Sequence, residues 1–173
     1  MPLPHDYKGQ ACSLARTLEV VGERWTLLIV RDAFYGVRRF GDFVAHLGIP
    51  RAVLTERLNS LTAAEVLIRV STPGRRDEYE LTGKGVSLWP VVRALVQWGD
   101  DNYAVAGPRR RFRHVTDGEP IDGTGLCTGC GAAVPVEDIL VVPGPGLEPP
   151  SDDADPVTVA LAQPHRMLLP LRH

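Results

Sequence analysis

The chain has 173 residues, with 19 Lys and Arg against 21 Asp and Glu, and 44% of its residues are hydrophobic. This length predicts one domain, or one domain with an appendage. The hydrophobic content excludes a disordered chain, and no apolar run approaches the roughly 20 residues that cross a bilayer, so we expect a soluble globular protein without a membrane partner. The first residues lack the basic and apolar segments of a signal peptide, which predicts a cytoplasmic location in which the three cysteines form no disulfide framework.

Composition changes along the chain. Residues 1–103 hold all three Trp, all four Tyr and three of the four Phe, whereas residues 104–173 hold 10 of the 15 Pro and 8 of the 17 Gly. This division predicts a domain over 1–103 that contains the main core, followed by an extension over 104–173. Within the extension, residues 141–155 are dominated by Pro, Gly and acidic residues, which predicts a linker or mobile loop.

The first part of the chain is predicted to be mainly helical. Apolar residues recur every three or four positions from Leu14 to Leu28, with a break at Gly22. A turn at 48–50 separates two short helices, which is the pattern of a helix-turn-helix, and the second of them places its leucines within 54–61 on one buried side. The predicted helices span residues 14–21, about 23–35, 39–47 and 51–64.

After residue 64 the apolar pattern changes from helical to alternating. Residues 67–72 and 78–81 are predicted strands joined by a basic loop at 73–77, which makes the hairpin a wing. Thr82 is expected to cap one further helix, whose apolar residues exceed what a single face needs, so we expect a homodimer. The predicted fold is mainly α with a small β-hairpin wing: a winged helix-turn-helix domain, with a small β-rich Cys-x-x-Cys extension after it.

The basic residues predict contact with double-stranded DNA. From Arg38 to Arg76 there are seven arginines and three acids, a net charge of +4. In a helix-turn-helix, the second helix enters the major groove with its N-terminus first. An alternative is a packing unit with solvated arginines, or a module that binds protein. The predicted contacts are Arg51 and Thr55 to base edges, Arg57 and Asn59 to flanking groups, Arg75 and Arg76 to the backbone or minor groove, and Arg38 and Arg39 to phosphates.

Several ordered motifs resemble the HxlR family of bacterial winged-helix transcriptional regulators. They cover about residues 10–103, and one departure is Ser13, where the family commonly has Pro. The resemblance implies a cytoplasmic homodimer, joined by its first and last helices, that binds a short inverted repeat in DNA. We expect repression by occupancy of the operator, with release by an effector or by thiol modification. The motifs are Cys12–Leu14, Gly22–Ile29, Arg38–Phe40, Pro50–Leu58, Tyr79–Thr82 and Trp98–Gly99.

Cys12 is a candidate redox sensor. Similar regulators often carry a cysteine here that forms an intersubunit disulfide or is alkylated. A position at the start of a helix favours the thiolate, and Lys8 and Arg16 are close in sequence. The alternative is a small apolar residue packed near the dimer interface.

The extension contains a candidate structural zinc site. Cys127 and Cys130 form a Cys-x-x-Cys turn with glycines, and residues 133–136 are predicted to be the strand that follows. His114 and Asp117 occupy a His-x-x-Asp segment that resembles the His-x-x-Cys of related tails, so they are the candidate remaining ligands. His165 or His173 could replace Asp117. Alternatives are a degenerate ribbon without metal and a redox-active cysteine pair.

The effector and the role of the tail are left open by the sequence. A small apolar ligand could bind between the dimer interface and the winged helices, where Trp25, Trp89 and Trp98 would supply aromatic walls, or these residues are core. Residues 109–113 are a basic cluster that either touches flanking DNA or forms a solvated linker. No nucleophile–base pair, phosphate loop or paired carboxylates occur in motif spacing, so we expect no enzyme, although a small metal- or thiol-active enzyme is the alternative.

Overall fold

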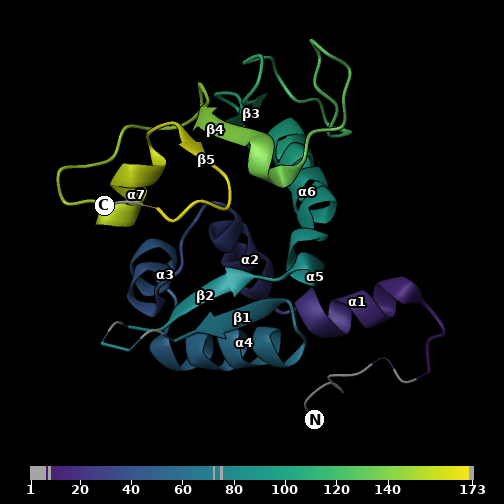
Figure 1. Ribbon diagram of the computed structural model, residues 1–173, viewed down its shortest axis with the longest axis vertical. Helices are drawn as coiled ribbons and strands as arrows, with labels where there is room; N and C mark the ends of the chain where they lie inside the picture. Colours follow the sequence, from purple (N-terminus) through teal and green to yellow (C-terminus); the bar gives the residue numbers. More distant parts are fainter. Residues whose placement is uncertain (1–6, 8, 72, 75, 172–173) are drawn as a thin grey trace.

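The structure is a computed structural model, and it describes residues 7, 9–71, 73–74 and 76–171 (Figure 1). A winged helix occupies one end of the molecule, the C-terminal extension occupies the other, and α6 runs alongside both. The elements are α1 (Ser13–Val21), α2 (Thr26–Phe34), α3 (Phe40–Leu47), α4 (Arg51–Ala63), β1 (Leu67–Val70), β2 (Glu78–Leu81), α5 (Gly83–Val86), α6 (Trp89–Tyr103), β3 (Arg110–His114), the 3-10 helix η1 (Val136–Asp138), β4 (Ile139–Pro143), α7 (Pro156–Leu161) and β5 (His165–Arg166).

The predicted helix-turn-helix is confirmed. Helix α3 ends at Gly48, whose positive φ of 61° suits a residue without a side chain, and α4 begins immediately after Pro50. Leu54, Leu58 and Leu61 of α4 are 0–1% exposed, as their spacing predicted. Burying each of these side chains contributes about 2 kcal/mol, so α4 is fixed by its apolar side while its other side stays in solvent.

The predicted wing is also confirmed. Strands β1 and β2 pair antiparallel, with Leu67 opposite Leu81 and Val70 opposite Glu78. The backbone before α3 joins this hairpin, because Tyr79 N donates to Arg38 O at 2.8 Å. The wing is therefore attached to the start of the helix-turn-helix.

The single helix expected after Thr82 is instead two helices, α5 and α6. Thr82 does cap the first, since its side chain accepts from Gly85 N. The helix is interrupted at residues 87–88, and α6 starts with Pro90 in its first turn. Proline has no N–H to donate to the carbonyl four residues earlier, which favours a new helix start at Trp89 over a continuous helix.

The extension is a three-stranded antiparallel sheet in the order β3–β4–β5. Two predictions fail here. Residues 141–143 lie in β4 and not in a loop, because Val141 is fully buried against the rest of the core. Residues 133–136 do not form a strand: Ala133 makes one isolated bridge to Leu126, and a 3-10 helix starts at Val136.

The basic cluster at 109–113 is not a solvated linker, because most of it forms β3. Phe112 is buried against Trp89 of α6, with ring centroids 5.2 Å apart, and Arg110 donates to the carbonyl of Leu161. Burial lowers the pKa of Arg110. Alternation along the strand thus turns Arg110 and Phe112 into the molecule.

The extension and the winged helix share one hydrophobic core. Phe34 of α2 packs on Trp89 with centroids 5.2 Å apart. The segment after β5 returns to the winged helix, where Leu168 N donates to Phe34 O and Leu171 N donates to Gly36 O, each at 2.9 Å. Across the described residues, no helix combines the length and the apolar character that a bilayer crossing requires.

Candidate nucleic-acid interface

The solvent side of α4 presents polar residues on successive turns. Arg51, Thr55 and Asn59 are exposed, at a spacing of four residues. The guanidinium of Arg51 lies 5.0 Å from the ring centroid of Phe40, the first residue of α3. No side chain caps the start of α4, so its first backbone N–H groups are free of a capping partner. Such a helix start attracts phosphate oxygen, and the arginine beside it adds a fixed positive charge.

Three of the arginines predicted to contact DNA are held by acidic partners. Arg38 pairs with Glu80 and also donates to Leu168 O at 3.0 Å, so its side chain connects β2 to the C-terminal segment. Arg39 Nε lies 3.2 Å from Glu78 Oε1.

Arg57 is the third. Its side chain is only 16% exposed, pairs with Glu56, and lies 3.7 Å from Glu23 Oε2. Arg38 and Arg57 are thus placed to hold helices and strands together.

These pairs change the charge of the surface. Extending the segment from residue 76 to residue 80 adds Asp77, Glu78 and Glu80, so the net charge falls from +4 to +1. Among the residues predicted to bind DNA, Arg51 and Arg76 are the exposed arginines of the described chain for which no acidic partner is seen within ion-pair distance. Arg75 lies outside the described residues.

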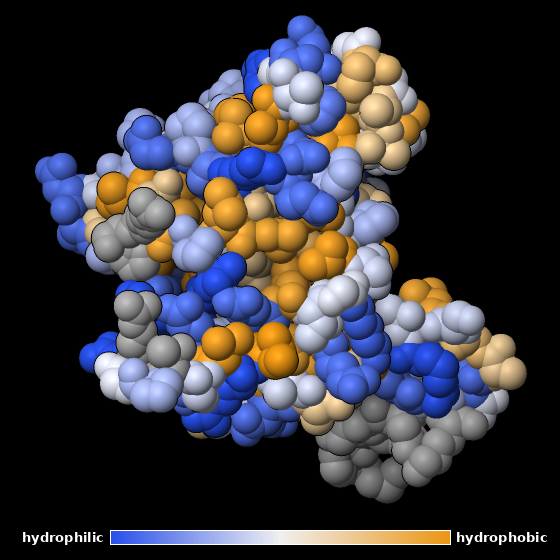
Figure 2. Space-filling view, in the orientation of Figure 1, coloured by the Kyte–Doolittle hydropathy of each residue, from blue (hydrophilic) through white to orange (hydrophobic). Residues whose placement is uncertain are grey.

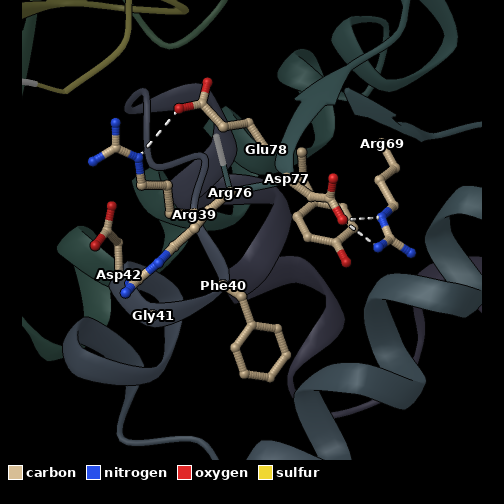
Figure 3. A pocket seen from close by; sticks show the side chains of 9 residues that line it. Arg39, Phe40, Gly41, Asp42, Arg69, Arg76, Asp77 and Glu78 are labelled. Carbon is tan, nitrogen blue, oxygen red and sulfur yellow. Dashed lines mark hydrogen bonds and ion pairs between the residues drawn. The ribbon is translucent and has the colours of Figure 1, made fainter. Parts of the chain in front are cut away.

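A groove of about 770 Å³ separates the start of α3 from the wing (Figure 3). Arg39 and Arg76 lie beside each other at one side of it, with Asp42 nearby. On the other side, Asp77 accepts from Arg69 Nε at 2.8 Å and from Ser71 Oγ at 2.6 Å.

These bonds explain two charge effects in the wing. The Ser71 hydroxyl and the Arg69 guanidinium hold the pKa of Asp77 below its usual value, and the hydrogen bond to Asp77 raises the pKa of Arg69. The network fixes the two strands of the wing at its tip. Arg69 was not among the predicted site residues, because its pairing with Asp77 depends on the strand register that places it opposite Tyr79.

A buried carboxylate connects α2 to α3. Asp32 is fully buried and accepts from Arg31 Nε at 2.9 Å, from Arg31 Nη2 at 2.7 Å and from His46 Nδ1 at 2.7 Å. Paired and hydrogen-bonded in this way, the charge is tolerated in the core and fixes the angle between the two helices. This contact was not predicted, although Asp32 is a charged residue on the apolar side of the second predicted helix.

Four candidate metal ligands converge at the far end of the molecule. His114 ends β3, Asp117 lies in the following turn, and Cys127 and Cys130 lie in the Cys-x-x-Cys turn. The four ligand atoms lie within 4.8 Å of one another. The N–H of Glu119 and the Cys127 thiol lower the pKa of Asp117, while burial raises the pKa of the Cys127 thiol.

The alternative fourth ligands are not placed at this cluster. His165 lies in β5, edge-on to Tyr35 with ring centroids 5.6 Å apart, and burial lowers its pKa. His173 lies outside the described residues.

Cys12 and the tryptophans occupy different environments. Cys12 precedes the first residue of α1 and is exposed in the single chain, without a side-chain capping bond. Trp89 is part of the core and therefore does not line a ligand pocket. Trp25 is half-buried under Arg24, whereas Trp98 is 57% exposed and contacts Tyr103.

Comparison with known proteins agrees with this geometry. A family model described as HxlR-like helix-turn-helix matches residues 20–106. A relative from Mycobacterium tuberculosis, named as the uncharacterized HTH-type transcriptional regulator Rv3095, is 44% identical over 149 residues, which cover 84% of this chain and 93% of the relative.

Two solved structures are similar as well. PA1607, described as a candidate transcription factor, has a TM-score of 0.63 and 37% identity, covering 76% of this chain and 94% of its own. HypR, described as a redox regulator and solved in its reduced form, has a TM-score of 0.50 and 29% identity, covering 54% of this chain and 96% of its own.

The exposed start of α4, the turn before it and the attached wing define a winged helix-turn-helix transcriptional regulator. The chain belongs to the HxlR-like helix-turn-helix family.

Proposed function

We propose that the protein is a cytoplasmic, sequence-specific DNA-binding repressor that acts as a homodimer on an inverted-repeat operator. The observation that carries this proposal is the exposed start of α4, which has no side-chain cap and presents Arg51 and Thr55 to solvent. Arg76 of the wing is also exposed, and it lines the groove beside the start of α3. Arg51 and Thr55 read base edges, Asn59 contacts a flanking group, and Arg76 contacts the backbone or minor groove. Arg39 reaches phosphate when its pair with Glu78 opens.

Exposed apolar residues on α1 and α6 support the dimer. Leu14 and Leu18 are 64% and 39% exposed, and on α6 the spacing of Val91, Leu95 and Trp98 places them on one side at 42–57%. The end of α1 adjoins the start of α6, because Val21 and Leu88 line one cavity. Figure 2 shows hydrophobic surface over the free end of α1. A second copy that covers these helices would bury the apolar surface and set two copies of α4 about 34 Å apart on DNA.

Replacing Trp98 by Glu is expected to convert the dimer into an 18.9 kDa monomer, because a charge would be buried where an aromatic side chain packs. Light scattering would measure the mass. The matched control is Val159→Glu, since Val159 is 47% exposed on α7 and lies outside the proposed dimer surface. A Trp98 variant that remains dimeric would refute this interface.

Release from DNA is proposed to follow a small change at the dimer surface. Oxidation or alkylation of Cys12, at the start of α1, would alter the packing of two α1 helices, and a small ligand at the same surface would have a similar effect. The redox regulator HypR is similar to this chain over 54% of its residues. A shift of a few ångströms between the two copies of α4 is enough to lose one half-site.

A gel-shift titration of the reduced protein against the DNA upstream of its own gene tests the proposal. We expect specific binding over a random duplex, which weakens at least tenfold between low and physiological salt because each phosphate contact releases a counterion. The same titration after mild oxidation, with Cys12→Ala as the control, tests thiol control. If no duplex binds at either salt concentration, the fold serves protein recognition instead.

A further inference from the structure

Two segments of the extension bring four metal-binding side chains together. His114 Nδ1 lies 3.4 Å from Asp117 Oδ1 and 3.6 Å from Cys130 Sγ, and Cys127 Sγ lies 3.5 Å from the same Asp117 oxygen. All four ligand atoms lie within 4.8 Å of one another. Within the described part of the chain, this is the group of His, Cys, Asp and Glu side chains that could hold a metal ion.

The distances match tetrahedral coordination of zinc. Zinc binds sulfur at about 2.3 Å and nitrogen or oxygen at about 2.0–2.2 Å, so neighbouring ligand atoms of a tetrahedron lie about 3.3–3.8 Å apart. With Asp117 Oδ1 as the carboxylate ligand atom, three of the six separations are 3.4–3.6 Å, and all of them are within 4.8 Å, so a small inward movement of the side chains completes the tetrahedron. Two sulfurs and an imidazole favour zinc over Mg²⁺ or Ca²⁺, which prefer oxygen.

The backbone of the Cys-x-x-Cys turn is already arranged for a metal. Burial raises the pKa of the Cys127 thiol, and the N–H groups of Cys130 and Gly129 oppose this larger effect by lowering that pKa. Gly131, with a positive φ of 73°, closes the turn by donating its N–H to Cys127 O at 2.9 Å. N–H groups aimed at a sulfur stabilise the thiolate that a metal requires.

Gly129 also allows the two halves of the cluster to meet. A Cβ added to Gly129 would lie 2.6 Å from Cγ of Glu119 and 3.3 Å from Oδ2 of Asp117. A larger residue would therefore displace the Glu119 side chain and crowd the Asp117 carboxylate. The absence of a side chain at Gly129 therefore lets the Cys-x-x-Cys turn lie close to the segment at 114–119.

We propose that His114, Asp117, Cys127 and Cys130 bind one zinc ion in a closed structural site. Binding forms four bonds to the metal and releases two protons, one from each thiol, to solvent. The histidine binds through Nδ1 as neutral imidazole, with its remaining proton on Nε2. Because protein side chains fill all four positions, no position is open for a substrate, and the metal is structural.

The zinc ion would link the irregular segment at 115–135 to strand β3 of the extension. Cys127 is 1% exposed, and its N–H donates to Ala132 O at 2.9 Å, but residues 115–135 contain no helix or strand longer than an isolated bridge. His114 ends β3, which carries Phe112 into the shared core. Coordination therefore links an irregular segment to the strand that packs on α6. This inference does not depend on DNA binding.

Cobalt and zinc titrations of the full chain, reduced and stripped of metal with a chelator, test the site. We expect one equivalent of Co²⁺ to give the visible absorption of tetrahedral thiolate coordination, and one equivalent of Zn²⁺ to remove it. The variant Cys130→Ser is expected to bind at least tenfold more weakly, whereas Cys12→Ala, which removes the cysteine outside the cluster, leaves the affinity unchanged. The variant Asp117→Cys is expected to bind more tightly, because a thiolate replaces the carboxylate.

Three results would overturn the proposal. One is the absence of the cobalt spectrum in the reduced wild-type chain. The second is an equal metal affinity in the wild type and in Asp117→Cys. This comparison tests the site even if Cys130→Ser does not fold. The third is a Cys127–Cys130 disulfide that re-forms in air in the presence of zinc, which would favour a redox pair.

Discussion

The variant Gly36→Ala is expected to lose at least about 2 kcal/mol of unfolding free energy. Gly36 follows α2 with a φ of 88°, which residues with a side chain rarely adopt. An added Cβ would also overlap the carbonyl oxygen of Leu169 and lie 3.1 Å from Leu171 N. Because Leu171 N donates to Gly36 O, the C-terminal segment cannot move away without losing its own hydrogen bonds.

Urea unfolding monitored by tryptophan fluorescence would measure this loss. Gly41→Ala is the matched control, because Gly41 lies inside α3 with no atom within 4 Å of an added Cβ. That change is expected to be neutral or to stabilise by up to about 1 kcal/mol, since alanine favours helix over glycine. Equal midpoints for Gly36→Ala and the wild type would show that the C-terminal segment does not pack at Gly36 in solution.

Replacing Arg51 by Ala is expected to weaken operator binding by about 1–3 kcal/mol, or roughly fivefold to 150-fold, and to relax sequence preference. Arg51 is the first residue of α4 and is exposed beside Phe40, so its guanidinium lies at the helix start that we propose enters the major groove. Titration of the operator and of duplexes changed at single base pairs would separate affinity from specificity.

Arg76→Ala is the comparison variant for Arg51. Arg76 lies in the wing, and we expect its loss to weaken all duplexes alike and to reduce the salt dependence by about one phosphate contact. Unfolding midpoints of both variants should equal that of the wild type, because neither side chain is buried. Unchanged operator affinity in both variants would refute the proposed docking of α4 and the wing.

Local sequence patterns predicted the winged helix well. The leucines at 54, 58 and 61 and the alternation around 67–81 both arise from short-range periodicity, and both elements form where expected. The break at 87–88 was missed because Pro90 was counted within a helix whose apolar spacing continued across it. The strand β4 was missed because its Pro and Gly neighbours at 143–146 outweighed the apolar run before them.

The candidate site was harder to predict than the fold. The net charge of +4 was counted from Arg38 to Arg76. The count ended just before three acidic residues, Asp77, Glu78 and Glu80, which lower it to +1. Glu78 and Glu80 reach back across the sheet to Arg39 and Arg38, a contact that depends on strand register and not on sequence distance. Which arginines stay available to DNA is therefore decided by tertiary pairing, which a single sequence does not reveal.

The return of the chain to Gly36 has a consequence for synthesis on the ribosome. The hydrogen bonds from Leu168 and Leu171 to α2 and to the turn after it complete the packing of a segment made more than 130 residues earlier. The winged helix therefore emerges from the ribosome before residues 168–171, which form these hydrogen bonds. Until they follow, the part of its core around Phe34 and Gly36 is left uncovered, so the packing of this region is completed late in synthesis.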